Sequence, residues 1–145
     1  MNIQPTNIQP TNLQPTNLQP MNVDLTRRLN SPGADALFLS WRLQTDDRAE
    51  AQKTRRRLNS GETRQLYRIR SWVIVRGEVQ ALLSPAVSLD RIASSIWDEG
   101  SAPTSSRWVR RSECAKVVRD METIPVTLGL AARPEQWPWS SAAAL

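Results

Sequence analysis

The chain has 145 residues, of which 39% are hydrophobic, enough apolar side chain for one small domain and too little for two. Nineteen Lys and Arg against 14 Asp and Glu give a net charge of +5, which suits either a phosphate-bearing partner or a basic surface without one. The absence of histidine excludes Ser-His-Asp and Cys-His catalysis and His-ligated zinc, and the single cysteine excludes an internal disulfide.

The first 30 residues differ from the rest in composition. From Asn2 to Pro20 a five-residue unit, Asn-Ile/Leu-Gln-Pro-Thr, repeats with proline at fixed spacing. Each proline removes a backbone donor and restricts the residue before it, so neither a helix nor a central strand can run through the unit. We predict a disordered tail over residues 1–30, which is a flexible tether, a peptide ligand or translated repeat DNA, and one domain over residues 31–145.

The predicted domain begins with a buried strand, residues 36–43, followed by a solvent-facing helix over residues 45–58 that Asn59-Ser60-Gly61 closes. Residues 66–75 form a second strand, on which Arg68 and Arg70 share one face with Trp72 and Ile74.

A tight corner at Arg76-Gly77 predicts a β-hairpin with residues 79–83. A helix over residues 87–97 and a loop over residues 100–106 follow. The last helix has an apolar face made of Cys114, Val117, Val118 and Met121, and Pro125 ends it.

The stretch from Pro125 to Ser141 reads Pro-Val-Thr-Leu-Gly-Leu-Ala-Ala-Arg-Pro-Glu-Gln-Trp-Pro-Trp-Ser-Ser. It resembles the tail of the REP-associated tyrosine transposases, in which Asn-Pro-Val-x-Ala-Gly-Leu-Val precedes x-x-Pro-x-x-Trp-Pro-Trp-Ser-Ser. Ile124 and Leu128 stand where the family has Asn and Ala. Upstream, residues 38–43 and 71–75 resemble two of the family's strands in the same order.

The resemblance implies an α+β fold with an antiparallel sheet flanked by helices, ferredoxin-like as in the single-tyrosine transposases, and the order of predicted elements allows it. It also implies a DNA partner, hairpin or single-stranded, and a family cofactor of Mg²⁺ or Mn²⁺. No apolar run approaches the roughly 20 residues that span a bilayer, so we expect a cytoplasmic protein without membrane contact.

The residues that carry the family's chemistry are replaced. Glu78 and Gln80 stand where the family has a pair of metal-binding histidines, and Asp120 stands where it has the nucleophilic tyrosine, five positions before Pro125. Residues two apart on a strand share a face, so Glu78 and Gln80 keep the geometry of the pair and are weak candidates for a metal; we expect exposed polar residues and no cofactor. A carboxylate beside an anionic phosphodiester does not reproduce attack by a phenolic oxygen.

The candidate DNA-binding residues are basic side chains, which contact phosphate, and two tryptophans, which can stack on unpaired bases or anchor the tail on the sheet. They are Arg55, Arg56, Arg57, Arg68, Arg70, Arg107, Arg110, Arg111, Arg133, Trp137 and Trp139. The leading hypothesis is a degenerate, catalytically inactive transposase-family domain that binds DNA. The alternatives are metal-dependent nicking through Glu78 and Gln80, and a pseudogene product without a role.

Overall fold

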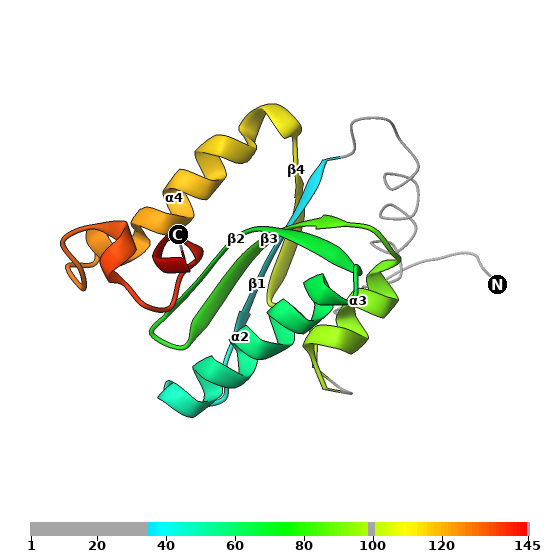
Figure 1. Ribbon diagram of the computed structural model, residues 1–145, viewed down its shortest axis with the longest axis horizontal. Helices are drawn as coiled ribbons and strands as arrows, with labels where there is room; N and C mark the ends of the chain where they lie inside the picture. The colour runs from blue at the N-terminus through cyan, green and yellow to red at the C-terminus, as the bar shows by residue number, and fades with distance from the viewer. Residues whose placement is uncertain (1–34, 99–100, 145) are drawn as a thin grey trace.

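The computed structural model describes residues 35–98 and 101–144, a sheet with helices packed on it (Figure 1). In chain order the elements are β1 (Ala36–Arg42), α2 (Arg48–Thr63), β2 (Tyr67–Val75), β3 (Glu78–Pro85), α3 (Leu89–Ile96), β4 (Ser105–Val109) and α4 (Cys114–Thr127). Short 3-10 helices lie at Arg111–Glu113, Pro134–Gln136 and Ser141–Ala144. The predicted repeat tail, residues 1–30, lies outside the described residues.

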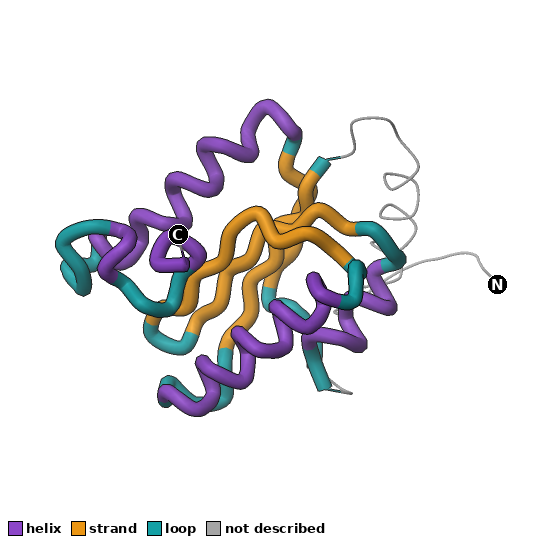
Figure 2. The backbone as a smooth tube through the Cα atoms, in the orientation of Figure 1, coloured by secondary structure: helices purple, strands orange, loops and turns teal. Residues whose placement is uncertain are grey.

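The four strands lie in the order β2-β3-β1-β4, and each neighbouring pair is antiparallel. Because β3 is inserted between β1 and β2, the β-α-β-β-α-β chain has the split arrangement of ferredoxin-like folds. Helices α2 and α3 pack on one face and α4 packs on the other, which makes the sheet the middle of three layers (Figure 2). The predicted fold class is therefore confirmed.

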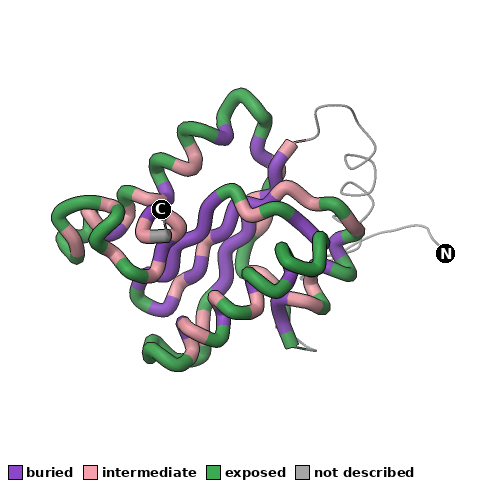
Figure 3. Tube along the Cα trace, in the orientation of Figure 1, coloured by how far each residue is buried: buried purple, intermediate pink, exposed green. Residues whose placement is uncertain are grey.

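Each face of the sheet has its own hydrophobic core, because alternate residues of a strand point to opposite sides. Leu39 of β1 packs with Leu58 of α2 and Ile92 of α3 in the larger core. Leu82 of β3 packs with Met121 of α4 in the smaller core. The buried parts of the chain follow the strands, while the outer sides of the helices are exposed (Figure 3). No helix within the described residues is long and apolar enough to cross a membrane.

Helix α2 is longer than predicted, because it continues through Gly61 to Thr63. Gly61 was expected to close the helix, yet it is buried within it, and a Cβ at this position would overlap the phenol of Tyr67. The glycine therefore allows close packing between the helix and the start of β2. Asp47 caps the other end, since its carboxylate accepts a 2.8 Å hydrogen bond from the backbone N–H of Glu50.

A β-bulge in β2 corrects the predicted faces of its arginines. The register with β3 pairs Ile69 with Leu83 but Ser71 with Leu82, so Arg70 is an extra residue on the β2 side. Arg68 precedes the bulge and lies on the α4 side of the sheet, opposite to Trp72 and Ile74. The side-chain alternation that was extrapolated from Trp72 back to Arg68 is wrong by one residue.

Two other boundaries differ from prediction near the end of the domain. Residues 105–109 were expected partly as loop but form β4, which pairs with β1. Pro125 was expected to end the last helix but is buried inside α4, which ends at Thr127. A proline in the last turn lacks only one backbone donor, and the N–H groups of Leu128 and Leu130 donate to Ile124 and Pro125 to complete the turn.

The Trp-Pro-Trp-Ser-Ser segment forms a clasp over the outer edge of β2. The backbone N–H of Ile74 donates to the Trp139 carbonyl oxygen at 2.9 Å, and the Ile74 carbonyl oxygen accepts from the Trp137 indole N–H at 2.9 Å. Trp137 packs against the core beneath α4, and Trp139 packs against the core beneath α2. The clasp therefore contacts both faces of the sheet and forms hydrogen bonds with backbone groups of the edge strand β2.

Ser141 completes the clasp through hydrogen bonds to β2 and α4. Its hydroxyl oxygen accepts from the backbone N–H of Trp72 at 3.1 Å and lies 3.0 Å from the hydroxyl of Ser71. The same hydroxyl lies 3.3 Å from the carboxylate of Glu122 on α4. The residues that carry the sequence resemblance in this segment therefore hold the chain end to the sheet and to the last helix.

Candidate nucleic-acid interface

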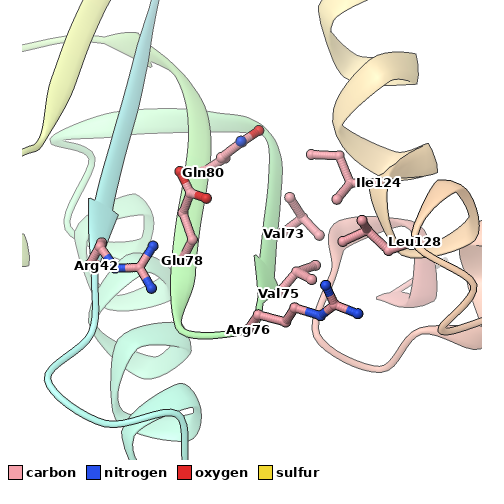
Figure 4. Close-up of a pocket in the computed structure, with 8 residues that line it drawn as sticks. All are labelled: Arg42, Val73, Val75, Arg76, Glu78, Gln80, Ile124 and Leu128. Carbon is pink, nitrogen blue, oxygen red and sulfur yellow. The ribbon is translucent and has the colours of Figure 1, made fainter.

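A pocket of about 300 Å³ opens on the α4 side of the sheet, between the β2–β3 hairpin and the end of α4 (Figure 4). Glu78 and Gln80, the residues at the family's histidine positions, both line it. Arg42 enters from the end of β1 and Arg76 from the hairpin turn. The remaining lining residues are Val73, Val75, Ile124 and Leu128.

The strand register fixes the polar side of this pocket. Arg42 of β1 is directly opposite Glu78 of β3, and Gln80 is opposite both Ser40 of β1 and Val73 of β2. Figure 4 shows the Arg42 guanidinium directed toward Glu78. The predicted placement of Glu78 and Gln80 on one face is confirmed, since they are two residues apart on an unbroken strand.

The hairpin turn presents Arg76 to the pocket. Both turn residues have positive φ, 53° at Arg76 and 78° at Gly77, as the twist of a two-residue hairpin requires. The predicted Arg76-Gly77 corner is therefore confirmed. The Arg76 side chain is exposed and extends toward the end of α4 (Figure 4).

Asp120, at the family's tyrosine position, does not line this pocket. It lies on α4 with 65% of its side chain exposed and forms a 2.9 Å ion pair with Lys116 on the same side of the helix. Ile124, one helical turn further on, occupies the wall of the pocket instead. The carboxylate is thus positioned for an intrahelical ion pair on the surface.

The donor set of the pocket does not fit a divalent metal ion. Glu78 offers one carboxylate and Gln80 one amide oxygen, while Arg42 and Arg76 bring two positive charges to the same walls. Mg²⁺ and Mn²⁺ favour oxygen ligands with negative charge. Across the described part of the chain, no group of three or more His, Cys, Asp or Glu side chains could hold a metal.

The three arginines predicted on α2 lie on the opposite side of the sheet from the pocket, because α2 packs on the other face. Arg55 lies over the ring of Trp139, with its guanidinium carbon 5.4 Å from the ring centre. Arg57 donates to the Ile96 carbonyl oxygen and to Asp98, and its guanidinium lowers the pKa of that carboxyl. Arg56 is exposed.

The other predicted basic residues are spread over three places. Arg68 and Arg70 lie toward the start of β2, where Arg70 donates to the Ser84 hydroxyl at 2.7 Å. Arg110 and Arg111 are exposed where β4 leads into α4. Arg133 lies in the exposed segment after α4, with its Nε 3.6 Å from the Glu135 carboxylate.

Arg107 belongs to the α4 side of the sheet, since it pairs with Phe38 across β4 and β1 and lies over its ring, 5.0 Å from the centre. Both predicted tryptophans, Trp137 and Trp139, lie in the clasp on β2 and are partly buried. The sequence interpretation missed Arg42. The alternation of Phe38, Ser40 and Arg42 along β1, a partly polar face, was the signal for it.

No family model and no curated protein matches this sequence. The fold, however, is similar to a solved structure of a REP-associated tyrosine transposase bound to a REP hairpin. The two share a fold. The similarity has a TM-score of 0.59 and covers 76% of this chain and 78% of that chain, at 13% sequence identity. The structural similarity therefore covers much more of the chain than the short tail that carries the sequence resemblance.

Proposed function

We propose that this chain is a DNA-binding protein with a transposase-like fold, which binds hairpin or single-stranded DNA and does not join strands through a tyrosine. The observation that carries the proposal is the basic α4 side of the sheet. Arg107 projects from β4 on that side, Arg42 lies at the pocket, and Arg110 and Arg111 follow where the chain enters α4. All of these side chains are exposed and available to phosphate.

The similarity to a transposase structure that contains a REP hairpin supports a nucleic-acid ligand for this fold. The net charge of +5 supports it independently, because phosphate contacts release counterions. Phe38, held beneath Arg107, adds a half-buried aromatic ring to this side of the sheet. An aromatic ring beside cationic side chains is a common arrangement for holding unpaired bases.

The proposed lack of strand transfer rests on three observations. Asp120 is a surface carboxylate engaged with Lys116, and the pocket that contains Glu78 and Gln80 lacks the ligands for a divalent ion. Tyr67, the single tyrosine of the chain, is buried under Gly61 and donates a 2.7 Å hydrogen bond to the Leu58 carbonyl oxygen. Its phenolic oxygen is therefore enclosed by protein.

Fluorescence anisotropy with labelled hairpin, single-stranded and fully paired oligonucleotides tests the binding. We expect the hairpin and the single strand to bind more tightly than the duplex. The logarithm of the binding constant should fall linearly with the logarithm of the salt concentration, with a slope of roughly −0.7 for each phosphate contact of a single strand. The single variants Arg110→Gln and Arg111→Gln are each expected to lower affinity and the salt slope, whereas Arg91→Gln, at an exposed position of α3, serves as the charge-matched control. Binding that ignores salt contradicts the proposal.

The same oligonucleotides, incubated with protein and Mn²⁺ and resolved on a denaturing gel, test the chemistry. We expect neither nicked DNA nor a covalent protein–DNA adduct. Nicking that disappears with Glu78→Gln would establish the metal-dependent alternative instead, because that change removes the carboxylate without changing the shape of the side chain.

A further inference from the structure

We propose that the pocket beside the β2–β3 hairpin binds a DNA phosphate directly through the guanidinium groups of Arg42 and Arg76, in place of a divalent metal ion. The inference rests on the proposed DNA-binding function and names the chemical group that this site accepts. It assigns phosphate binding to two arginines from separate parts of the chain, the end of β1 and the turn after β2.

The charges around the pocket favour an anion. Its walls carry two guanidinium groups and one carboxylate, that of Glu78, so the pocket has one net positive charge. Within the part of the chain that the structure describes, neither Arg42 nor Arg76 forms an ion pair at salt-bridge distance. A divalent cation here is repelled by two fixed positive charges, whereas a phosphodiester, with one negative charge, complements the net charge.

The two arginines can reach phosphate from different sides of the pocket. Arg42 lies across from Glu78 and extends from β1 toward β3, while Arg76 extends from the hairpin turn toward Leu128 (Figure 4). Guanidinium groups bind phosphate oxygens through paired N–H donors, which a compact metal ion or an ammonium cannot reproduce. Each guanidinium therefore offers paired donors to phosphate oxygens on its own side of the pocket.

The backbone at Arg76 supports a role for its side chain. Its φ of 53° lies in the left-handed region, where glycine, asparagine and aspartate are favoured at the first position of such a hairpin turn. A non-glycine residue there strains the backbone, and such positions concentrate at functional sites. Arg76 can contact phosphate from this turn position, whereas the glycine, asparagine or aspartate that the turn favours could not.

The other walls of the pocket are apolar. Val73 and Val75 of β2 are buried, so Ile124 of α4 and Leu128, which follows α4, provide the surface on which the sugar of a nucleotide can rest. Leu128 is 41% exposed, so its side chain is accessible at the pocket. A phosphate held by arginines, next to an apolar wall, matches the alternating charged and apolar character of a nucleic-acid strand.

Four single variants test the site with a fluorescein-labelled single-stranded oligonucleotide, in buffer that contains EDTA or Mg²⁺. Arg42→Gln and Arg76→Gln are each expected to weaken binding about tenfold, because each removes a charged hydrogen-bond donor. Arg91→Gln, which removes an exposed charge from α3, is expected to change affinity by less than about twofold. Glu78→Gln is expected to tighten binding, because it removes the negative charge from the pocket.

Glu78→Gln distinguishes the phosphate site from a metal site, because the two sites predict opposite changes in DNA affinity for this variant. A metal ligand at this position makes binding depend on Mg²⁺ and makes Glu78→Gln weaken it. Circular dichroism of each variant confirms folding, which these exposed or half-exposed positions are expected to preserve. Affinity that rises with Mg²⁺ and is lost in EDTA overturns the proposal.

A second measurement uses inorganic phosphate and NMR signals of the arginine Nε–H groups, and it does not depend on DNA binding. We expect phosphate to shift the Arg42 and Arg76 signals and to leave Arg91 unchanged. If phosphate shifts them but no oligonucleotide binds, the pocket is supported and the DNA-binding function fails. If the oligonucleotide binds equally well to Arg42→Gln and Arg76→Gln, the function stands and the pocket inference is overturned.

Discussion

The phenol of Tyr67 packs directly on the backbone of Gly61, in the last turn of α2, and its hydroxyl donates to the Leu58 carbonyl oxygen in the same helix. This contact joins the end of α2 to the start of β2 and buries both residues. Glycine is needed here for space and not for a left-handed backbone, because the residue lies inside the helix.

Gly61→Ala is therefore expected to destabilise the domain by about 1–3 kcal/mol, since the added methyl group overlaps the Tyr67 ring in a packed interior. Urea denaturation followed by circular dichroism measures the change. Ser60→Ala, at the exposed neighbouring position of α2, is the control and is expected to change stability by less than about 0.5 kcal/mol. A stabilising effect of Gly61→Ala, as at an ordinary helical glycine, would contradict the packing described.

Burial raises the pKa of Tyr67 above its ordinary value of 10.0. The folded state holds the phenolic proton more tightly than the unfolded state, so the protonated phenol contributes to the free energy of unfolding. This stabilisation is complete below pH 10 and is lost as the pH rises toward the folded pKa. We expect the free energy of unfolding to fall above pH 10 in urea titrations, and Tyr67→Phe to reduce that fall. An identical alkaline decline in both proteins would refute the assignment to Tyr67.

Trp137→Phe is expected to destabilise the domain by about 1–2 kcal/mol, because the Ile74 carbonyl oxygen loses the indole N–H that it accepts while the ring remains apolar. Amide hydrogen exchange gives a local measurement. The Ile74 N–H, which donates to Trp139, should exchange faster in the variant, and the Leu39 N–H in the central strand β1 should change only with global stability. Unchanged exchange at Ile74 would show that the clasp does not depend on this bond.

Asp120→Tyr is expected to fold normally and to form no covalent adduct with DNA. The position is mostly exposed, so a larger side chain is accommodated, with a stability change of about 0.5 kcal/mol or less. The donor set of the pocket with Glu78 and Gln80 still does not fit a divalent metal ion, so no metal activates a phosphate for the introduced tyrosine to attack. Denaturing gels of the variant incubated with hairpin DNA and Mn²⁺ check this, and a shifted protein–DNA band would contradict it.

The clasp explains what the recognisable end of the chain reports about the protein. Trp137, Trp139 and Ser141 form hydrogen bonds that hold the end of the chain to β2 and α4. Glu78 and Asp120 occupy exposed or half-exposed positions, where side chains can change without loss of packing. Resemblance in the tail is thus informative about the fold and says little about activity.

The sequence by itself determined the local elements. The apolar run of β1, the helical spacing of Cys114, Val117 and Met121, and the Arg76-Gly77 turn each depend on neighbouring residues, and the structure confirms them. The placement of Glu78 and Gln80 on one face follows from the same two-residue period.

Tertiary structure alone decided which distant residues meet. The bulge at Arg70 depends on the register with β3, and β4 depends on its pairing with β1, because its own sequence is short and partly polar. The pocket joins Arg42 to Arg76 through the order β2-β3-β1, which no local pattern encodes. Contacts between residues far apart in sequence are set by packing of the whole sheet, so they become visible when the strands are placed side by side.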